Sequence, residues 1–220
     1  MKKGVVLSLI AASLLLAGCK TELEVNTKYS ELKSQPLHAL TALTNVEIAG
    51  CSSHEDSRKP SDSLIKIQQM IPNVFKGAKY KECYTRKMNS FASFEIPLGV
   101  GTVDANTKYE NDLNIIYQKD GSLLAQANKD FYKRFRQFLK DNMISDLEMK
   151  ISVAITNDTG DDLKLNCFAA YVDDVPCSIG NTTFKQNSTL TFVLSDVSSD
   201  AILMKDRKGD RVLFASETKQ

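Results

Sequence analysis

The sequence predicts an α+β fold made of two modules, and three observations lead to this prediction. Residues 43–146 hold two segments with helical periodicity, and apolar runs separated by turn residues lie between them. This combination is typical of helices packed on one face of an antiparallel sheet. From residue 147 onward, apolar and polar residues alternate over short stretches, so residues 147–220 are expected to form a small all-β, sandwich-like module.

The chain begins with a segment typical of a secretory signal peptide. Lys2 and Lys3 precede a run from Gly4 to Ala17 that is apolar except for two serines. A membrane-spanning helix needs about 20 apolar residues, whereas this run is shorter and charged residues follow it directly. Residues 1–18 are therefore expected to be a signal peptide that is removed.

The end of this segment resembles the lipobox of bacterial lipoproteins, in the four residues Leu16-Ala17-Gly18-Cys19. The resemblance implies that the Cys19 thiol receives a diacylglyceryl group and that a peptidase cuts just before Cys19. It also implies that the new amine is acylated. Several acyl chains would hold the protein almost permanently, since each buried methylene contributes roughly 0.8 kcal/mol. The alternative is a chance match at an ordinary cleavage site, with Cys19 a spare thiol.

Lys20 carries a further implication of the same resemblance. An aspartate directly after the lipidated cysteine favours retention in the inner membrane, and this chain has lysine there. The resemblance therefore implies the outer membrane, on its periplasmic face. The organisation of the chain also resembles uncharacterised envelope lipoproteins, including prophage-carried ones, and this wider likeness implies no functional residues.

Four cysteines are left once Cys19 is assigned to lipid, namely Cys51, Cys83, Cys167 and Cys177. An even number in an exported chain indicates two disulfides. Four cysteines permit three pairings, and Cys51–Cys83 with Cys167–Cys177 is favoured because each pair falls in one module. Each bond would stabilise the fold by roughly 3–4 kcal/mol. No pair has the two-residue spacing of a zinc or redox motif, so neither metal nor cofactor is expected.

Residues 19–42 are expected to be a tether with one possible strand, because residues 23, 25, 27 and 29 alternate with polar ones. Residues 43–51 read as a strand. A polar loop follows, and Ser61 or Ser63 can cap a helix that Pro72 should end or kink. Two strands that turn near Asn89 come next, and then a hairpin around residues 119–121.

The clearest helix lies at residues 128–142, where Asn128 can act as the cap. Phe131, Phe135 and Phe138 fall on one face, and most of the cations fall elsewhere. The aromatic face is expected to pack on the sheet of the same module. The alternative is a helix that lies on an anionic membrane surface.

In the second module, strands are expected at 148–156, 163–171 and 188–196, with short strands near 201–205 and 211–215. Asp173-Asp174 are placed in the turn of a hairpin that brings Cys167 and Cys177 near facing positions.

Three short segments could carry chemistry, and each has a simpler explanation. His54-Glu55-Asp56 lack the spacing of metal ligands and are expected in a solvated loop. Residues 157–162, NDTGDD, have their glycine too early for an EF-hand-type calcium loop, so a hairpin turn is the preferred interpretation. Gly99-Val100-Gly101 is expected to be a turn rather than a dinucleotide fingerprint. His38 is expected to be a packing or surface residue. No catalytic residue is assigned.

The charge of the chain does not suggest a nucleic-acid partner, and none is expected. The formal charge of the chain is +1, and removal of Lys2 and Lys3 takes the mature part to −1, without a clustered basic excess. The sequence thus favours a lipid-anchored envelope lipoprotein with a non-enzymatic binding or structural role and a partner protein in the envelope. One alternative is a phage-exclusion lipoprotein that occludes an outer-membrane receptor. The other is an envelope hydrolase.

Overall fold

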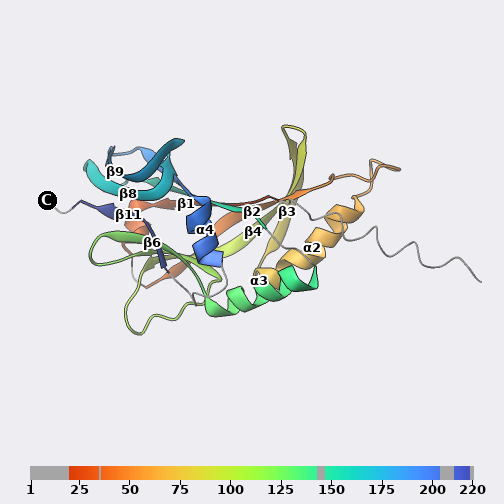
Figure 1. Cartoon of the computed structure of the whole chain (residues 1–220), viewed down its shortest axis with the longest axis horizontal. Coiled ribbons are helices and arrows are strands. Elements are labelled where there is room, and N and C mark those ends of the chain that lie inside the picture. Colours follow the sequence, from red (N-terminus) through yellow and green to blue (C-terminus); the bar gives the residue numbers. More distant parts are fainter. Residues whose placement is uncertain (1–19, 35, 143–146, 204–210, 219–220) are drawn as a thin grey trace, which may run out of the picture.

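The structure is a computed structural model that describes residues 20–34, 36–142, 147–203 and 211–218. Strands account for 51% of the chain and helices for 20%. Most of the strands form a barrel, and the two longest helices lie together at one end of it (Figure 1). Around the barrel the nine strands follow the order β10 (Thr189–Leu194), β7 (Met149–Thr156), β1 (Thr21–Lys28), β2 (His38–Ile48), β4 (Asn89–Thr102), β5 (Leu113–Tyr117), β6 (Ser122–Ala127), β11 (Arg211–Glu217) and β8 (Leu163–Val172).

Strand β8 closes the barrel by pairing with two strands in succession. Its residues Leu165–Cys167 pair with β11, and its residues Ala170–Val172 pair with β10. Between them, Ala169 has a φ of 44°, and its carbonyl oxygen accepts hydrogen bonds from Ser195 N at 3.0 Å and Ser198 Oγ at 3.3 Å. This irregular residue shifts the alternation, so the period-two pattern predicted for β8 holds only up to Cys167.

The barrel contradicts the predicted fold class. Strand β1 pairs in parallel with β7, from Thr21 opposite Met149 to Lys28 opposite Thr156, and β6 pairs with β11. Strands from the expected helix-on-sheet module at 43–146 and from the expected sandwich at 147–220 therefore belong to one closed sheet. Alternation along the sequence identifies a strand but not its partner, and the pairings that close this barrel join distant parts of the chain.

Apolar side chains fill the barrel. Inward-facing residues from all nine strands are buried in one cluster, which includes Leu23, Leu98, Val153, Phe192 and Phe214. Their removal from water is the main stabilising contribution to the fold, at roughly 25 cal/mol per Å² of apolar surface.

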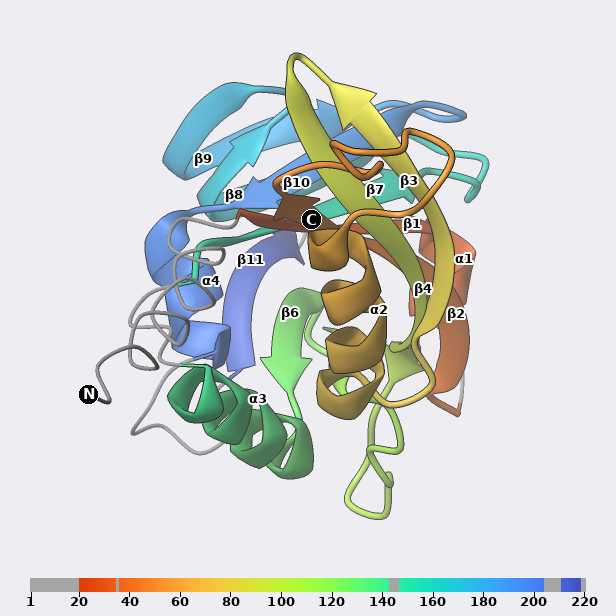
Figure 2. The same ribbon diagram turned by 90° about the vertical axis from the view of Figure 1, so that its right-hand side faces the viewer.

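Helices cover both ends of the barrel (Figure 2). At one end, the short helix α1 (Tyr29–Leu32) buries Tyr29 and Leu32 completely. The other end is covered by α2 (Asp62–Val74), α3 (Lys129–Asp141) and α4 (Asp196–Leu203). We call these the α1 end and the helical end. Strand β1 begins at the helical end, because Thr21 lines a small apolar cavity with Ile71 of α2 and Phe135 of α3.

The predicted caps of α2 and α3 are present. Ser61 Oγ accepts a hydrogen bond from Leu64 N at 3.1 Å, and Asn128 Oδ1 accepts one from Phe131 N at 2.7 Å. Pro72 does not end α2, which continues to Val74. The proline lies in the last turn of the helix, where its missing N–H removes a single hydrogen bond.

Helix α4 replaces the strand that was expected near residues 201–205. Ser195 Oγ accepts a hydrogen bond from Ser198 N at 3.2 Å, which is the geometry of an N-cap. Ile202 and Leu203 of α4 are buried in the main cluster. The apolar residues that suggested a strand therefore face the core from a helix.

Two strands lie outside the barrel. Strand β3 (Lys79–Arg86) pairs with β4, and β9 (Val175–Phe184) pairs with β8. The two hairpin turns have left-handed backbones at Lys87-Met88 and at Asp173-Asp174, which match the twist of a two-residue hairpin. Both hairpins agree with the sequence analysis.

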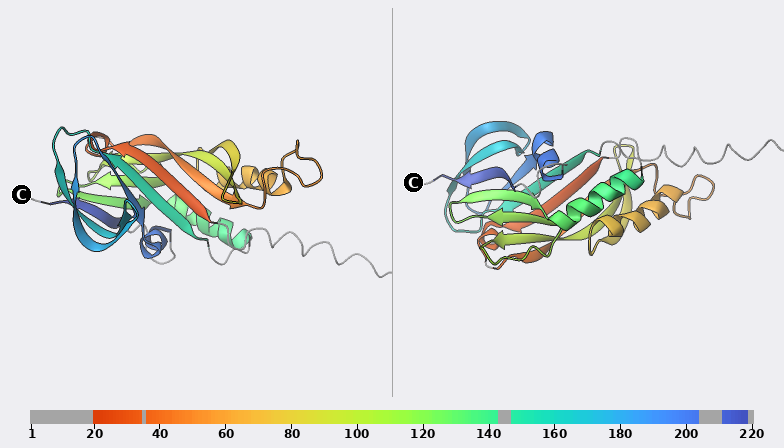
Figure 3. Two further views of the ribbon diagram at one scale, coloured as in Figure 1. Left: turned by 90° about the horizontal axis from the view of Figure 1, so that it is seen from above. Right: turned by 60° about the horizontal axis from the view of Figure 1, so that its bottom comes forward.

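The expected tether at 19–42 is largely ordered structure. Thr21 already begins β1, which spans residues 21–28, and β2 begins at His38 (Figure 3, left). The alternation from residue 23 to 29 correctly indicated a strand. Its two neighbours in the barrel, β2 and β7, hold it in place.

Candidate functional site

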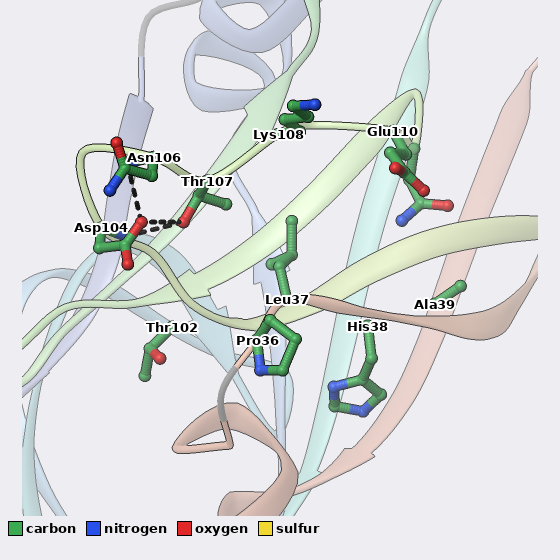
Figure 4. Close-up of a pocket in the computed structure, with 11 residues that line it drawn as sticks. Pro36, Leu37, His38, Ala39, Thr102, Asp104, Asn106, Thr107, Lys108 and Glu110 are labelled. Atoms are coloured by element: carbon green, nitrogen blue, oxygen red, sulfur yellow. Dashed lines mark hydrogen bonds between the residues drawn. The ribbon is translucent and has the colours of Figure 1, made fainter.

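A pocket of about 750 Å³ opens at the α1 end of the barrel (Figure 4). It lies between the segment that leads into β2 and the loop that joins β4 to β5. Its lining residues are Pro36, Leu37, His38 and Ala39 on one side, and Thr102, Asp104, Asn106, Thr107, Lys108, Glu110 and Asn111 on the other. We call it the α1-end pocket.

The first wall is fixed by contacts between Ser34 and β4. The Ser34 carbonyl oxygen accepts hydrogen bonds from Thr102 N at 2.9 Å and from Thr102 Oγ1 at 3.2 Å. Gly101 has a φ of 137°, and a Cβ there would lie 3.0 Å from the same oxygen. Glycine suits this position because it adopts a positive φ readily and has no Cβ that would collide with the Ser34 carbonyl oxygen. Ser34 Oγ also lies 3.1 Å from His38 Nδ1, so the imidazole is held at the rim.

The second wall is a loop organised by Asp104. One carboxylate oxygen of Asp104, Oδ1, accepts hydrogen bonds from Thr107 Oγ1 and from Asn106 N, each at 2.9 Å. Asp104 N in turn donates to Thr107 Oγ1 at 2.8 Å. The hydroxyl of Thr107 and the N–H of Asn106 lower the pKa of Asp104, so the side chain is held as a carboxylate. The loop therefore keeps its shape without a ligand.

Two asparagines join this loop to the barrel. Asn128 Nδ2 donates a 2.7 Å hydrogen bond to the carbonyl oxygen of Asn111, which lines the pocket. Asn114 is buried on β5, and its Oδ1 has no hydrogen-bond partner among the described residues. A Cβ on Gly99 of β4 would lie only 2.1 Å from that oxygen. Gly99 and Gly101 thus lie inside β4 and allow close packing, whereas the sequence analysis placed them in a turn.

The pocket offers hydrogen-bonding and charged groups of both signs. His38, Lys108, Asp104 and Glu110 contribute an imidazole, an ammonium and two carboxylates. In the part of the chain that the structure describes, no group of three or more His, Cys, Asp or Glu side chains is arranged to hold a metal ion. The arrangement therefore suits recognition of a polar ligand by hydrogen bonds and charge.

A second pocket, of about 660 Å³, lies at the helical end beside the start of β1. Lys20 and Glu148 line it and form a 3.9 Å ion pair that is largely exposed. Ser199 of α4 also lines it, and the Ser199 hydroxyl is buried without a hydrogen-bond partner among the described residues.

A polar cluster lies at the α1 end of the barrel. Tyr29 Oη donates a 2.7 Å hydrogen bond to Glu217 Oε1, and Lys33 Nζ lies 2.6 Å from the same oxygen. Burial and the neighbouring Glu217 carboxylate raise the pKa of Tyr29, and the same two causes raise the pKa of Tyr117 to about 12. This cluster fastens β11 to α1, which makes its role structural.

Both disulfides are present with the pairing that the sequence analysis favoured. Cys51 bonds to Cys83 and Cys167 bonds to Cys177, with Cα–Cα distances of 5.7 and 6.4 Å. Cys83 lies on β3 and Cys177 lies on β9. Each bond therefore ties down one of the two strands outside the barrel. Cys19, the expected lipidation site, lies outside the described residues.

The other segments singled out by sequence are structural. In the His54-Glu55-Asp56 loop, Asp56 Oδ1 lies 2.9 Å from Arg58 Nε. Residues 157–162 are not a hairpin turn, because β7 and β8 do not pair with each other. Asn157 is buried in that connection, and its Nδ2 donates hydrogen bonds to the carbonyl oxygens of Asp161 and Phe184, at 2.8 and 2.9 Å.

Sequence reasoning missed the α1-end pocket. His38 was treated as a packing or surface residue, and residues 104–111 were left without a role. One signal was available in Asp104-Ala105-Asn106-Thr107, where Asp, Asn and Thr can hydrogen-bond to nearby backbone and build a fixed turn. Nothing in the local sequence indicates that the segment before β2 lies opposite this turn.

None of the helices in the described ranges is both long enough and apolar enough to span a membrane. Comparison with known proteins finds no matching curated protein and no matching solved structure. A match does come from one protein family, whose description is a domain of unknown function, DUF7424, and it extends over residues 21–217. Since this range includes the whole barrel from β1 to β11, the chain belongs to the DUF7424 family.

Proposed function

We propose that this protein is a lipid-anchored lipoprotein of the bacterial envelope. In this proposal Cys19 carries the lipid, the protein faces the periplasm from the outer membrane, and it binds another envelope protein rather than catalysing a reaction. The support for the lipid is the lipobox-like sequence Leu16-Ala17-Gly18-Cys19 after a signal-like segment. The two disulfides suit an oxidising compartment.

The observation that carries the binding role is the position of the α1-end pocket. Strand β1 begins at Thr21, two residues after Cys19, and runs for eight residues toward the α1 end. At about 3.3 Å per residue the end of β1, where the pocket lies, is roughly 23 Å from Thr21 along the strand. A lipid on Cys19 would hold the helical end at the membrane, and the pocket would face away from the bilayer.

The chemistry of the pocket favours binding over hydrolysis. A hydrolase of the general acid type needs a carboxyl group whose pKa is raised toward neutral pH. In the α1-end pocket the pKa of Asp104 is lowered by its hydrogen bonds, and its Oδ1 is already occupied by Thr107 and Asn106. Such a group orders a loop and can accept a hydrogen bond from a ligand.

Photocrosslinking in intact cells tests this role. A photoreactive amino acid replaces Asn106 in the pocket or, as the control, Lys185, which is exposed in the turn after β9. We expect a discrete adduct with an envelope protein from position 106, none from position 185, and loss of the adduct in the Cys19→Ser variant. Equal adducts from both positions would contradict a role for the pocket. An adduct that contains an outer-membrane phage receptor would point to exclusion as the biological outcome.

A further inference from the structure

We propose that helix α3 contacts anionic phospholipid headgroups through a stripe of four cationic side chains. The stripe follows the sequence spacing of 4, 3 and 4 residues, which keeps side chains on one face of a helix. It consists of Lys129, Lys133, Arg136 and Lys140.

The stripe points away from the protein core. At 100° per residue its four members fall within an arc of about 60°. Phe131 and Phe135 lie on the opposite side of α3 and are buried in the core, with 0% and 4% of their surface exposed. The three lysines of the stripe are exposed, and Arg136 is half-buried. The aromatic face therefore packs on the barrel, as the sequence analysis expected, and the cations are free to meet another surface.

Little acidic charge opposes the stripe. Within the described ranges Lys133 is the one member with an ion pair, a 3.8 Å contact between its Nζ and Oδ1 of Asp130, and both side chains are exposed. The second acid of α3, Asp141, accepts a hydrogen bond from Gln137. Helix α3 carries five cations and two acids, and one of the cations, Arg134, is paired with the buried Asp112. The four cations of the stripe outnumber the two acids, so a net positive charge faces outward.

The stripe lies near the proposed lipid attachment point, and on this point the inference rests on the proposed function. Thr21, Phe135 and Phe138 line one small cavity, so α3 lies beside the start of β1 (Figure 3, right). Cys19 precedes Thr21 by two residues, which span at most about 7 Å. Acyl chains on Cys19 would therefore hold the part of α3 beside Thr21 close to the headgroups, where charge attraction is still strong.

Anionic phospholipid is the partner that this chemistry fits. A row of ammonium and guanidinium groups without exposed aromatic side chains on the same face binds phosphate and does not insert into the acyl region. Each cation near such a surface adds to the attraction, which is weakened by salt. The stripe would add a second attachment to the membrane at the helical end, beside the one that the lipid on Cys19 provides.

Lysine acetylation footprinting of the purified full lipoprotein in vesicles tests the proposal. Vesicles contain either phosphatidylcholine alone or phosphatidylcholine with phosphatidylglycerol. We expect Lys129, Lys133 and Lys140 to react at least about threefold more slowly with phosphatidylglycerol present, and to recover in 1 M salt. The internal controls are Lys119, Lys164 and Lys185, which are exposed elsewhere. Equal slowing of both lysine sets, or of neither, would overturn the proposal.

A pair of matched variants separates this inference from the lipid anchor. The triple variant K129Q/K133Q/K140Q and the control K119Q/K164Q/K185Q lose the same charge. We expect only the first to lower cosedimentation with phosphatidylglycerol vesicles at low salt, measured in the Cys19→Ser background so that no lipid anchor masks the difference. Equal cosedimentation of the two variants would overturn the stripe. The mass of the wild-type N-terminal peptide tests the anchor separately, because a Cys19 without lipid defeats the anchor proposal and leaves the vesicle result standing.

Discussion

The hydroxyl of Tyr29 lies 2.7 Å from Oε1 of Glu217, although 188 residues separate them in the sequence. The same carboxylate oxygen lies 2.6 Å from Nζ of Lys33, and that ammonium lies 4.7 Å from the centre of the Tyr29 ring. Tyr29 and Lys33 come from α1 and its end, and Glu217 ends β11. The contact joins the helix that covers one end of the barrel to the last strand of the chain.

This contact should make stability depend on pH. Burial raises the pKa of Glu217, but hydrogen bonds from Lys33 and Tyr29 outweigh this effect, and the net pKa lies below the usual value of a glutamate. A lowered pKa contributes stability that is complete above the pKa of the unfolded chain, about 4.3, and is lost as the pH falls through the folded value. We expect Glu217→Gln to lower the free energy of unfolding by about 1–2 kcal/mol at pH 7.

Urea denaturation at pH 7 and at pH 3 measures this dependence. The difference between the wild type and Glu217→Gln should shrink at the lower pH. Glu82→Gln, which removes an exposed carboxylate on β3, serves as the control and should change little at either pH. A difference that stays the same from pH 7 to pH 3 would argue against the lowered pKa.

A buried ion pair should fasten α2 and α3 to the barrel. Asp112 has 3% of its surface exposed, and its Oδ1 lies 2.5 Å from Arg134 Nη2, while its Oδ2 accepts a hydrogen bond from Lys76 N at 2.7 Å. We expect Arg134→Met to cost about 3–5 kcal/mol of unfolding free energy, because it leaves a buried carboxylate uncompensated. The double variant Asp112→Asn/Arg134→Met should recover part of that loss in chemical denaturation. Full additivity of the two single changes would show that the residues act independently.

Gly99 should be intolerant of even a methyl group. Its Cβ would fall 2.1 Å from Asn114 Oδ1, so Gly99→Ala forces a buried side chain to move and should cost about 1–3 kcal/mol in thermal or urea unfolding. Gly50→Ala is the matched control, since the nearest atom to its Cβ is 3.8 Å away. Adding Asn114→Ala to Gly99→Ala should relieve the clash. No relief in the double variant would mean that the strain lies elsewhere.

The disulfides should differ in their contribution to stability. Cys51–Cys83 closes a loop with a sequence separation of 32 residues, and Cys167–Cys177 one of 10 residues. By loop-closure entropy the losses on removal are about 3.7 and about 2.7 kcal/mol. Urea midpoints of the two Cys→Ser double variants, measured under oxidising conditions, should show the larger loss for Cys51→Ser/Cys83→Ser. The reverse order would indicate that the β8–β9 hairpin depends on its bond for more than loop closure.

Local patterns predicted most of the elements but not their assembly. Three predicted features depend on only a few adjacent residues each, and all three are present: the caps at Ser61 and Asn128, and the turn at Asp173-Asp174. The parallel pairing of Thr21 with Met149 joins residues 128 positions apart, and no local pattern encodes it. The two-module interpretation was wrong because it assumed that the strands of each half of the chain pair only with one another.

The errors at single elements and at the pocket have different causes. Ala169 adopts a left-handed backbone because β8 passes from β11 to β10 there, and this is a property of the closed barrel. Helix α4 could have been predicted from Ser195 followed by Asp196, which together are a typical helix start. The α1-end pocket could not, because its two walls meet only when β2 and β4 pair.

The most direct test of the account is metabolic labelling with a fatty acid, followed by separation of membrane and soluble fractions. We predict that the wild-type chain is labelled and is found in the membrane fraction. Cys19→Ser should be unlabelled and soluble, while Cys51→Ser/Cys83→Ser keeps its label. Label that persists in Cys19→Ser, or a wild-type chain that carries none, would contradict the lipid anchor on which the proposed orientation of the barrel depends.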